Sequence, residues 1–168
     1  MTETQVRKGS TRMPLWQLWL TLGLLAVVLG IWIRLSAPGW LLVITGVILL
    51  ILMVAHPIVQ AIAVLNGGAH RMRIASLLLL SDVFFVLGFG FQIDFTDAPG
   101  SYMALTSFYY QVIRGLGSSS MPTVPDGLSA LYVALTVAFL VGLIVTWGLL
   151  LAVSLRRPKE NTPGQPPA

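Results

Sequence analysis

Cysteine is absent from this sequence of 168 residues, and Asp, Glu, Lys and Arg together make up only 10% of it. The lack of cysteine excludes a disulfide scaffold, thiolate metal sites, iron–sulfur clusters and thiol nucleophiles. A soluble domain carries about 25% charged residues. The low charge, combined with an apolar content of 56%, therefore excludes an ordinary water-soluble enzyme and also a disordered chain. A small polytopic membrane protein remains, with the lipid bilayer as its first partner.

Histidine is also scarce: the sequence holds 2 histidines, too few for a multi-histidine metal site. We therefore predict no metal and no cofactor. The formal net charge is +4, but the basic residues stand in small groups beside apolar runs. That arrangement indicates orientation in a membrane rather than binding of nucleic acid.

Long apolar runs, by contrast, are abundant. A hydrocarbon core about 30 Å thick needs roughly 20 apolar residues in a helix, and four runs have this length. We predict an all-α integral membrane protein, a four transmembrane helix bundle whose single membrane domain covers residues 1–155. Pro57 predicts a kink in the second span, and the polar, Pro-rich tail 156–168 is expected to be disordered. The predicted spans are 15–33, 40–65, 74–93 and 128–155.

The Lys and Arg residues set the orientation of these spans. With four spans, eight of the 10 basic residues fall on the side that holds both tails and the second loop. The positive-inside rule then places both termini in the cytoplasm of a multi-pass protein of the cell membrane. Aromatic residues near the span ends fit an interfacial belt; they are Trp16, Trp19, Trp32, Trp40, Tyr132 and Trp147.

The third loop, residues 94–127, is the only sizeable segment outside the spans. Its apolar and aromatic residues recur with helical spacing from Tyr102 to Arg114, which predicts a short amphipathic helix capped by Asp97 or Ser101. We expect this helix to lie at the outer interface or to cap the bundle. A re-entrant, pore-lining element is the alternative.

Asp82 is the one charged residue far inside a predicted span. An ionisable group there costs about 2.5–3.5 kcal/mol and needs a partner or a proton. Counting the helical rise of about 1.5 Å per residue from the span ends places three other polar side chains in the same half of the membrane. They would form a polar layer with Asp82, and they are His56, Thr21 and Thr146.

This layer has two interpretations. It is a proton or cation relay, as Asp and His pairs often are in membranes, or it is packing in which a neutral Asp82 bonds a neighbouring helix. At the outer end of the third span, Asp94 and Asp97 form an acidic pair. They either attract cations or cap the following helix. Because a helix is predicted directly after them, capping is the favoured interpretation.

Small residues recur every fourth position in the fourth span. Such a face permits close helix packing, and we expect it to meet a similar, weaker face of Gly23, Ala26 and Gly30 in the first span. A homo-oligomer or a partner membrane subunit is the alternative use of this face. Its members are Ala130, Ala134, Ala138 and Gly142.

The residues therefore favour a non-catalytic integral membrane protein, either an accessory subunit or a self-associating structural protein. The alternative is a small transporter or channel protomer with a proton or cation relay at Asp82. An intramembrane enzyme is the weakest interpretation, because the sequence shows no nucleophile, metal constellation or paired acid and base.

Overall fold

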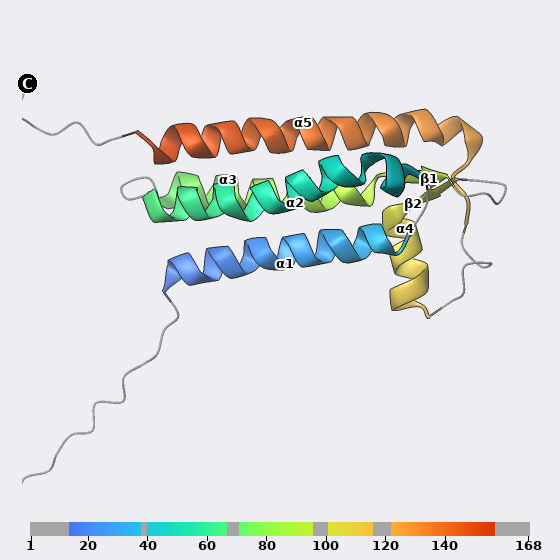
Figure 1. Cartoon of the computed structure of the whole chain (residues 1–168), viewed down its shortest axis with the longest axis horizontal. Helices are drawn as coiled ribbons and strands as arrows, with labels where there is room; N and C mark the ends of the chain where they lie inside the picture. Colours follow the sequence, from blue (N-terminus) through green and yellow to red (C-terminus); the bar gives the residue numbers. More distant parts are fainter. Residues whose placement is uncertain (1–13, 38–39, 67–70, 96–100, 116–121, 157–168) are drawn as a thin grey trace, which may run out of the picture.

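The computed structural model describes residues 14–37, 40–66, 71–95, 101–115 and 122–156. Four long helices run alongside one another (Figure 1), and each is long and apolar enough to cross a membrane. The expectation of a small, mainly helical membrane protein with four spans is confirmed by the length and composition of these helices. The helices are α1 (Leu15–Leu35), α2 (Trp40–Asn66), α3 (Arg71–Gly90) and α5 (Ser129–Ser154).

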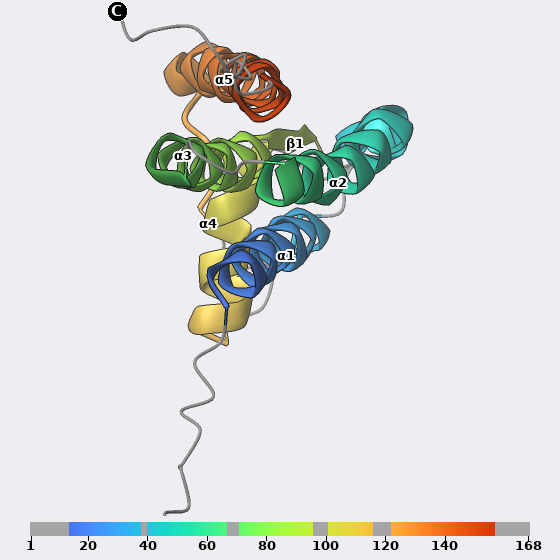
Figure 2. The same cartoon turned by 90° about the vertical axis from the view of Figure 1, so that its left-hand side faces the viewer.

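The four helices pack in a ring in which α1 touches α2 and α3, and α5 touches α2 and α3. Figure 2 shows α1 and α5 on opposite sides of α2 and α3. Helices α2 and α3 make few backbone contacts with each other. The core contains Phe85, Phe89, Leu143 and Leu150.

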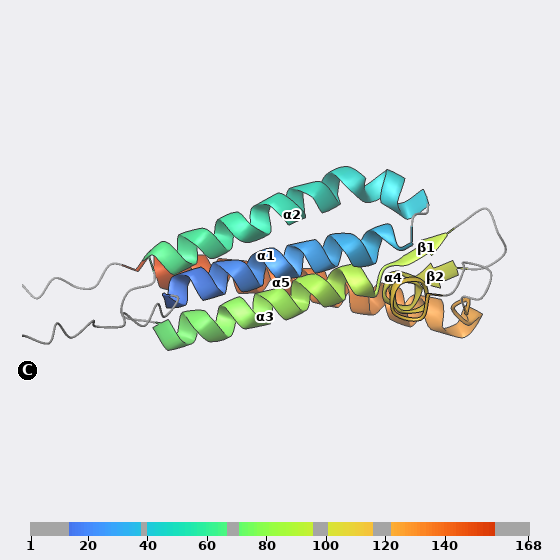
Figure 3. The same cartoon turned by 90° about the horizontal axis from the view of Figure 1, so that it is seen from below.

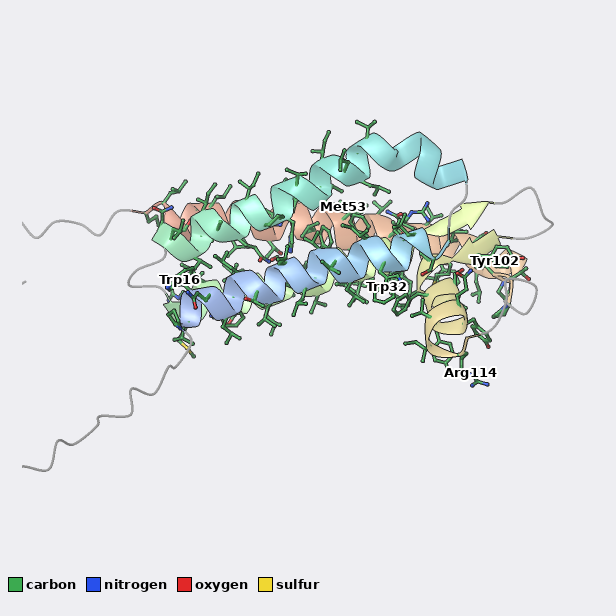
Figure 4. All side chains as sticks on the ribbon, turned by 60° about the horizontal axis from the view of Figure 1, so that its bottom comes forward. Trp16, Trp32, Met53, Tyr102 and Arg114 are labelled. Atoms are coloured by element: carbon green, nitrogen blue, oxygen red, sulfur yellow. The ribbon has the colours of Figure 1, made fainter. Side chains whose placement is uncertain are left out.

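The outward faces of the helices are apolar. Large side chains stay exposed along every span, among them Leu25 on α1, Val47 on α2, Leu79 on α3 and Val141 on α5. Soluble monomeric proteins rarely expose so much contiguous apolar surface, whereas in a membrane lipid tails would cover it. At the two ends of α1, Trp16 and Trp32 are both exposed (Figure 4), as expected for side chains at an interface.

Helix α2 is continuous through Pro57. Figure 3 shows that α2 lies at an angle to α1 and that the end of α2 nearest Trp40 changes direction. A proline removes one intrahelical hydrogen bond and crowds the preceding turn; the kink expected at Pro57 stays a prediction.

The end of the bundle away from Leu15 and Ser154, which we call the hairpin end, carries a strand pair that the sequence did not predict, followed by helical segments where a helix was expected. Strand β1 (Ile93–Phe95) pairs in antiparallel fashion with β2 (Ser101–Met103). After it come α4 (Ala104–Phe108), the π-helix η2 (Tyr109–Ile113) and, nearer α5, the 3-10 turn η4 (Asp126–Leu128).

The predicted start of the loop helix is therefore wrong. Ser101 and Tyr102 belong to β2, and the helix begins at Ala104, after Met103, which makes no side-chain capping bond. The backbone of β2 is paired with β1, and the Ala104 amide donates to the Gln92 carbonyl over 2.9 Å. These bonds hold the chain extended up to the first residue of α4.

The expected pairing of the two small-residue faces is also not found. Gly142 of α5 lies under Phe84 of α3, where an added Cβ would come within 2.8 Å of the ring. Gly23 and Gly30 of α1 lie against Gln60 and Phe85 instead. The helices α1 and α5 are separated because α2 and α3 lie between them. Three members of the α5 face remain exposed within this chain: Ala130, Ala134 and Ala138.

Candidate functional site

A cluster of polar side chains lies in the interior of the bundle, and we call it the polar cluster. His56 and Gln60 come from α2, Ser81 and Asp82 from α3, and Trp147 from α5. His56, Gln60 and Ser81 are almost wholly buried, and Asp82 is 8% exposed. His56 and Gln60 are one helical turn apart and so share a face of α2. The cluster joins α2 and α3, whose backbones make few contacts with each other.

His56 is held from both sides. Its Nδ1 accepts a hydrogen bond from Nε1–H of Trp147 over 3.2 Å, and its Nε2 lies 2.9 Å from Oδ1 of Asp82. Because the indole nitrogen can only donate, Nδ1 carries no proton in this arrangement. The neutral ring then bears its proton on Nε2 and donates it to Asp82.

The Gln60 amide supplies the second donor to Asp82. Its Nε2 lies 2.5 Å from Oδ1 of Asp82 and 3.4 Å from Oγ of Ser81, whose own hydroxyl donates to the Leu78 carbonyl. The same Nε2 is 3.0 Å from Nε2 of His56. With a proton on each nitrogen, that last contact brings two donors together and is not a hydrogen bond.

Apolar layers close the cluster at both ends. Toward the hairpin end, His56 stacks on Phe85 with 4.4 Å between ring centroids, and Phe85 stacks on Phe89 at 4.6 Å. Toward the termini, the buried side chains of Ala63, Leu78 and Leu150 belong to the same core. The polar cluster is thus an isolated polar layer within an apolar interior.

Of the four residues predicted to form a polar layer, the structure brings two together. His56 and Asp82 are in contact. Thr146 is buried, but its hydroxyl donates to the Gly142 carbonyl over 2.7 Å. Thr21 is exposed and donates to the Gln17 carbonyl. Both threonines satisfy their hydroxyl on the preceding turn of their own helix, as is common inside helices.

Sequence reasoning missed Gln60, Ser81 and Trp147. The position of Gln60, four residues after His56, was an available signal, because that spacing places both on one helix face. Trp147 was assigned to the interfacial belt, which is wrong: it is 8% exposed and belongs to the core. Its indole N–H finds its acceptor on His56, which is what a buried tryptophan needs.

The predicted acidic pair of Asp94 and Asp97 stays a prediction. Asp94 lies in β1 opposite Tyr102, and Asp97 lies outside the described residues. Within the parts of the chain that the structure describes, no group of three or more His, Asp and Glu side chains could hold a metal ion.

A second set of buried polar groups lies at the hairpin end. Arg34 of α1 is 1% exposed, and its Nη1 donates to the Ala37 carbonyl over 2.8 Å. Near it in the fold, Oε1 of Gln92 and Oγ of Ser107 are buried without a hydrogen-bond partner among the described residues. Buried polar atoms of this kind are commonly bridged by water. By contrast, both ring nitrogens of His56 have a hydrogen-bond partner.

The polar cluster can therefore do two things chemically. It can tie helices together, since an interhelical hydrogen bond in a membrane contributes about 0.6 kcal/mol on average and at most about 1.7 kcal/mol. It can also hold a proton, because both His56 and Asp82 are ionisable. The Ser81 hydroxyl of the cluster donates to the Leu78 carbonyl and not to His56, so the two are not arranged as a nucleophile hydrogen-bonded to its base.

Comparisons with protein families, with curated proteins and with solved structures find no match to this chain. The geometry supports a small helical membrane protein with one polar cluster between its spans.

Proposed function

We propose that this chain is a non-catalytic membrane protein, an accessory subunit or a self-associating structural protein, whose polar cluster is a clasp between α2, α3 and α5. The observation that carries this proposal is the engagement of His56 on both ring nitrogens, by Trp147 and by Asp82. A histidine held in this way has no nitrogen left for a substrate.

The surroundings of the clasp support the same role. Phe85 and Phe89 cover it toward the hairpin end with two stacked rings. Gly23 of α1 leaves room for the Gln60 side chain, because a Cβ at Gly23 would lie 1.5 Å from its Oε1. All four spans therefore contribute to the clasp or to its fit, which suits a device that fixes the arrangement of the helices.

The exposed part of the small-residue face supplies the surface for association. Ala130, Ala134 and Ala138 lie four residues apart on α5 and are exposed, and small residues let membrane helices approach closely. The test is the mass and composition of the particle extracted in gentle detergent. A homo-oligomer or a stable complex with another membrane protein supports the proposal, and a monomer contradicts it.

A relay at Asp82 is the second candidate function. It is favoured by the distance of 2.9 Å between His56 Nε2 and Asp82 Oδ1, a pair of ionisable groups inside the spans. Thr21 and Thr146 are not needed for it, since each bonds its own helix. Proton or cation flux through vesicles containing the protein, compared with the Asp82→Asn variant, tests this function.

We further propose that α4 and η2 form an interfacial element at the outer surface. Figure 1 shows them running across the direction of the spans at the hairpin end. Phe108 packs edge-on against the exposed Trp32 with 6.0 Å between centroids, and Tyr109, Val112 and Ile113 are exposed. An amphipathic segment with these residues fits the boundary between headgroups and acyl chains.

The proposal also covers the type of membrane and the orientation of the chain in it. With both termini in the cytoplasm of a cell-membrane protein, the hairpin end faces outward. Because the chain has no native cysteine, a single cysteine placed in either tail can be tested with a membrane-impermeant thiol reagent on whole cells. Protection in both tails supports this orientation, and labelling of either tail contradicts it.

A further inference from the structure

We propose that the end of the bundle opposite the hairpin end binds anionic phospholipids through the phosphate of their headgroups. We call it the basic end: α1 begins there at Leu15, α2 ends at Asn66, α3 begins at Arg71 and α5 ends at Ser154. Figure 1 shows these four helix ends on the same side of the molecule. The proposal goes beyond the clasp and does not depend on it, because it concerns the surface of this end and not the interior of the bundle.

Charge is distributed unequally between the two ends. Eight of the 10 basic residues, but only two of the 6 acidic residues, stand next to the basic end in the sequence. These two are Glu3 and Glu160; three of the others belong to residues 94–127, and Asp82 is inside the spans. The chain therefore leaves most of the positive charge of the basic end without a counter-charge of its own, and anionic groups from outside the chain can supply it.

The structure describes two exposed arginine side chains at this end, Arg73 in the first turn of α3 and Arg156 two residues after the end of α5. The first turn of α3 contains no acidic residue. Neither arginine makes an ion pair or a side-chain hydrogen bond with any residue that the structure describes. Helices α3 and α5 pack against each other, and α3 begins at the end where α5 stops (Figure 1). The two guanidinium groups are thus presented at the same end of one helix pair.

The neighbours of these arginines favour a lipid over an acidic protein as the ligand. Met72 is 84% exposed beside Arg73, and Leu155 is 60% exposed beside Arg156. Each position joins a large apolar side chain, which acyl chains would cover, to a cation that a headgroup would meet. Trp16, exposed at the same end of α1 (Figure 4), fits this boundary as well. An acidic protein surface supplies the charge but not the apolar cover, whereas a phospholipid supplies both.

The chemistry of the guanidinium group suits the phosphate of such a lipid. The group is planar, stays charged and offers paired N–H donors that fit two phosphate oxygens. Phosphatidylglycerol carries one negative charge on its phosphodiester, which the choline group of phosphatidylcholine cancels. A basic residue near a membrane surface strengthens the attraction to anionic lipid by about fivefold. The basic end should therefore select phosphatidylglycerol over phosphatidylcholine.

Spin-labelled lipids in vesicles that contain the full chain test this inference. The vesicles are made of phosphatidylcholine with a trace of labelled phosphatidylglycerol or labelled phosphatidylcholine. Electron paramagnetic resonance then measures the fraction of each label that is immobilised at the protein. We expect a larger immobilised fraction for phosphatidylglycerol and a smaller difference at high salt, because salt screens exposed charges.

Substitution of the two arginines locates the site. Arg73→Gln and Arg156→Gln together should lower the preference for phosphatidylglycerol, by up to about fivefold for each arginine, and Arg73→Lys with Arg156→Lys should retain most of it. Arg114→Gln is the matched control, because Arg114 is also exposed but lies at the hairpin end. It should leave the preference unchanged.

Three results would overturn the inference: equal immobilisation of the two lipids, a preference that the double glutamine variant keeps, or one that Arg114→Gln lowers as much. If the arginines bind an acidic protein instead, the purified chain shows no preference that depends on them, which also overturns it. If the double variant does not fold, the salt titration of the unmodified chain decides, and a preference that salt does not lower counts against the inference. The proposed function fails separately, through a monomeric particle in gentle detergent, whatever the lipid preference.

Discussion

The indole Nε1–H of Trp147 donates to Nδ1 of His56 over 3.2 Å, joining residues 91 positions apart in the sequence. The bond ties α5 to α2 and settles which nitrogen of the histidine carries the proton. On the other side of the ring, the Nε2–H group of His56 donates to Oδ1 of Asp82. Trp147 is thus a positioning residue: it acts on Asp82 through His56.

Trp147→Phe removes this donor and keeps an aromatic ring. We expect His56 to lose its fixed tautomer and the protein to lose about 1 kcal/mol of unfolding free energy, the usual contribution of one hydrogen bond. Nitrogen-15 NMR of labelled histidine reads the tautomer directly. The measurement is made in a His70→Gln background, so that His56 gives the only signal.

Trp16→Phe serves as the matched control, because Trp16 is exposed at the end of α1 away from the hairpin. It should leave the His56 spectrum unchanged. An unaltered Nε2–H tautomer in Trp147→Phe would show that the indole does not set it.

Gly23→Ala tests the fit of α1 against the polar cluster. The new methyl group would overlap Oε1 of Gln60, so Gln60 must leave its bonds, and we expect a loss of about 1–3 kcal/mol, typical of overpacking. Gly148→Ala on α5 is the control, since nothing lies within 4 Å of its added Cβ. Reversible unfolding in detergent measures both.

In a Gln60→Ala background, where the obstructing side chain is absent, Gly23→Ala should lower the unfolding free energy only slightly. If Gly23→Ala lowers the unfolding free energy as much in the Gln60→Ala background as in the unmodified chain, the added methyl group does not clash with Gln60.

The spans were predictable because their signal is local. Apolar runs begin where α1 and α2 begin, at Leu15 and Trp40, and no tertiary contact is needed to recognise them. The hairpin was not predictable in this way. Strands of three residues, such as β1 and β2, are too short to show an alternating pattern, and their pairing depends on a contact across the loop.

The polar cluster was half predictable for a related reason. Counting the helical rise places His56 and Asp82 in the same half of the membrane, because depth depends on position along one helix. Which face each side chain presents depends on packing between helices. Thr21 turned outward, and Trp147 turned inward to His56; neither orientation follows from depth alone.

Proton flux separates the clasp from the relay. We expect vesicles with the unmodified chain and vesicles with Asp82→Asn to collapse a pH gradient equally slowly, because Phe85 and Phe89 cover the cluster toward the hairpin end. A dye trapped in the vesicles follows the internal pH. Faster collapse with the unmodified chain, abolished in Asp82→Asn, would instead establish the relay.

A spin label at Ile113→Cys tests the interfacial element. Ile113 is 62% exposed on η2, near Arg114 at the tip of the element (Figure 4). We expect the label to lie at headgroup depth, about 5–10 Å into the boundary region. The Ile51→Cys label, exposed on the middle of α2, should lie deeper. Equal access of water-soluble relaxation agents to a label at 113 and to one in the C-terminal tail would contradict this placement.

The central claim is that His56 and Asp82 hold α2 and α3 together. A double-mutant cycle on reversible unfolding in detergent, with His56→Ala, Asp82→Ala and both together, measures their coupling directly. The clasp predicts a favourable coupling of about 0.6 kcal/mol and up to about 1.7 kcal/mol, the range found for interhelical hydrogen bonds in membranes. Strictly additive losses, with no coupling between the two side chains, would contradict it.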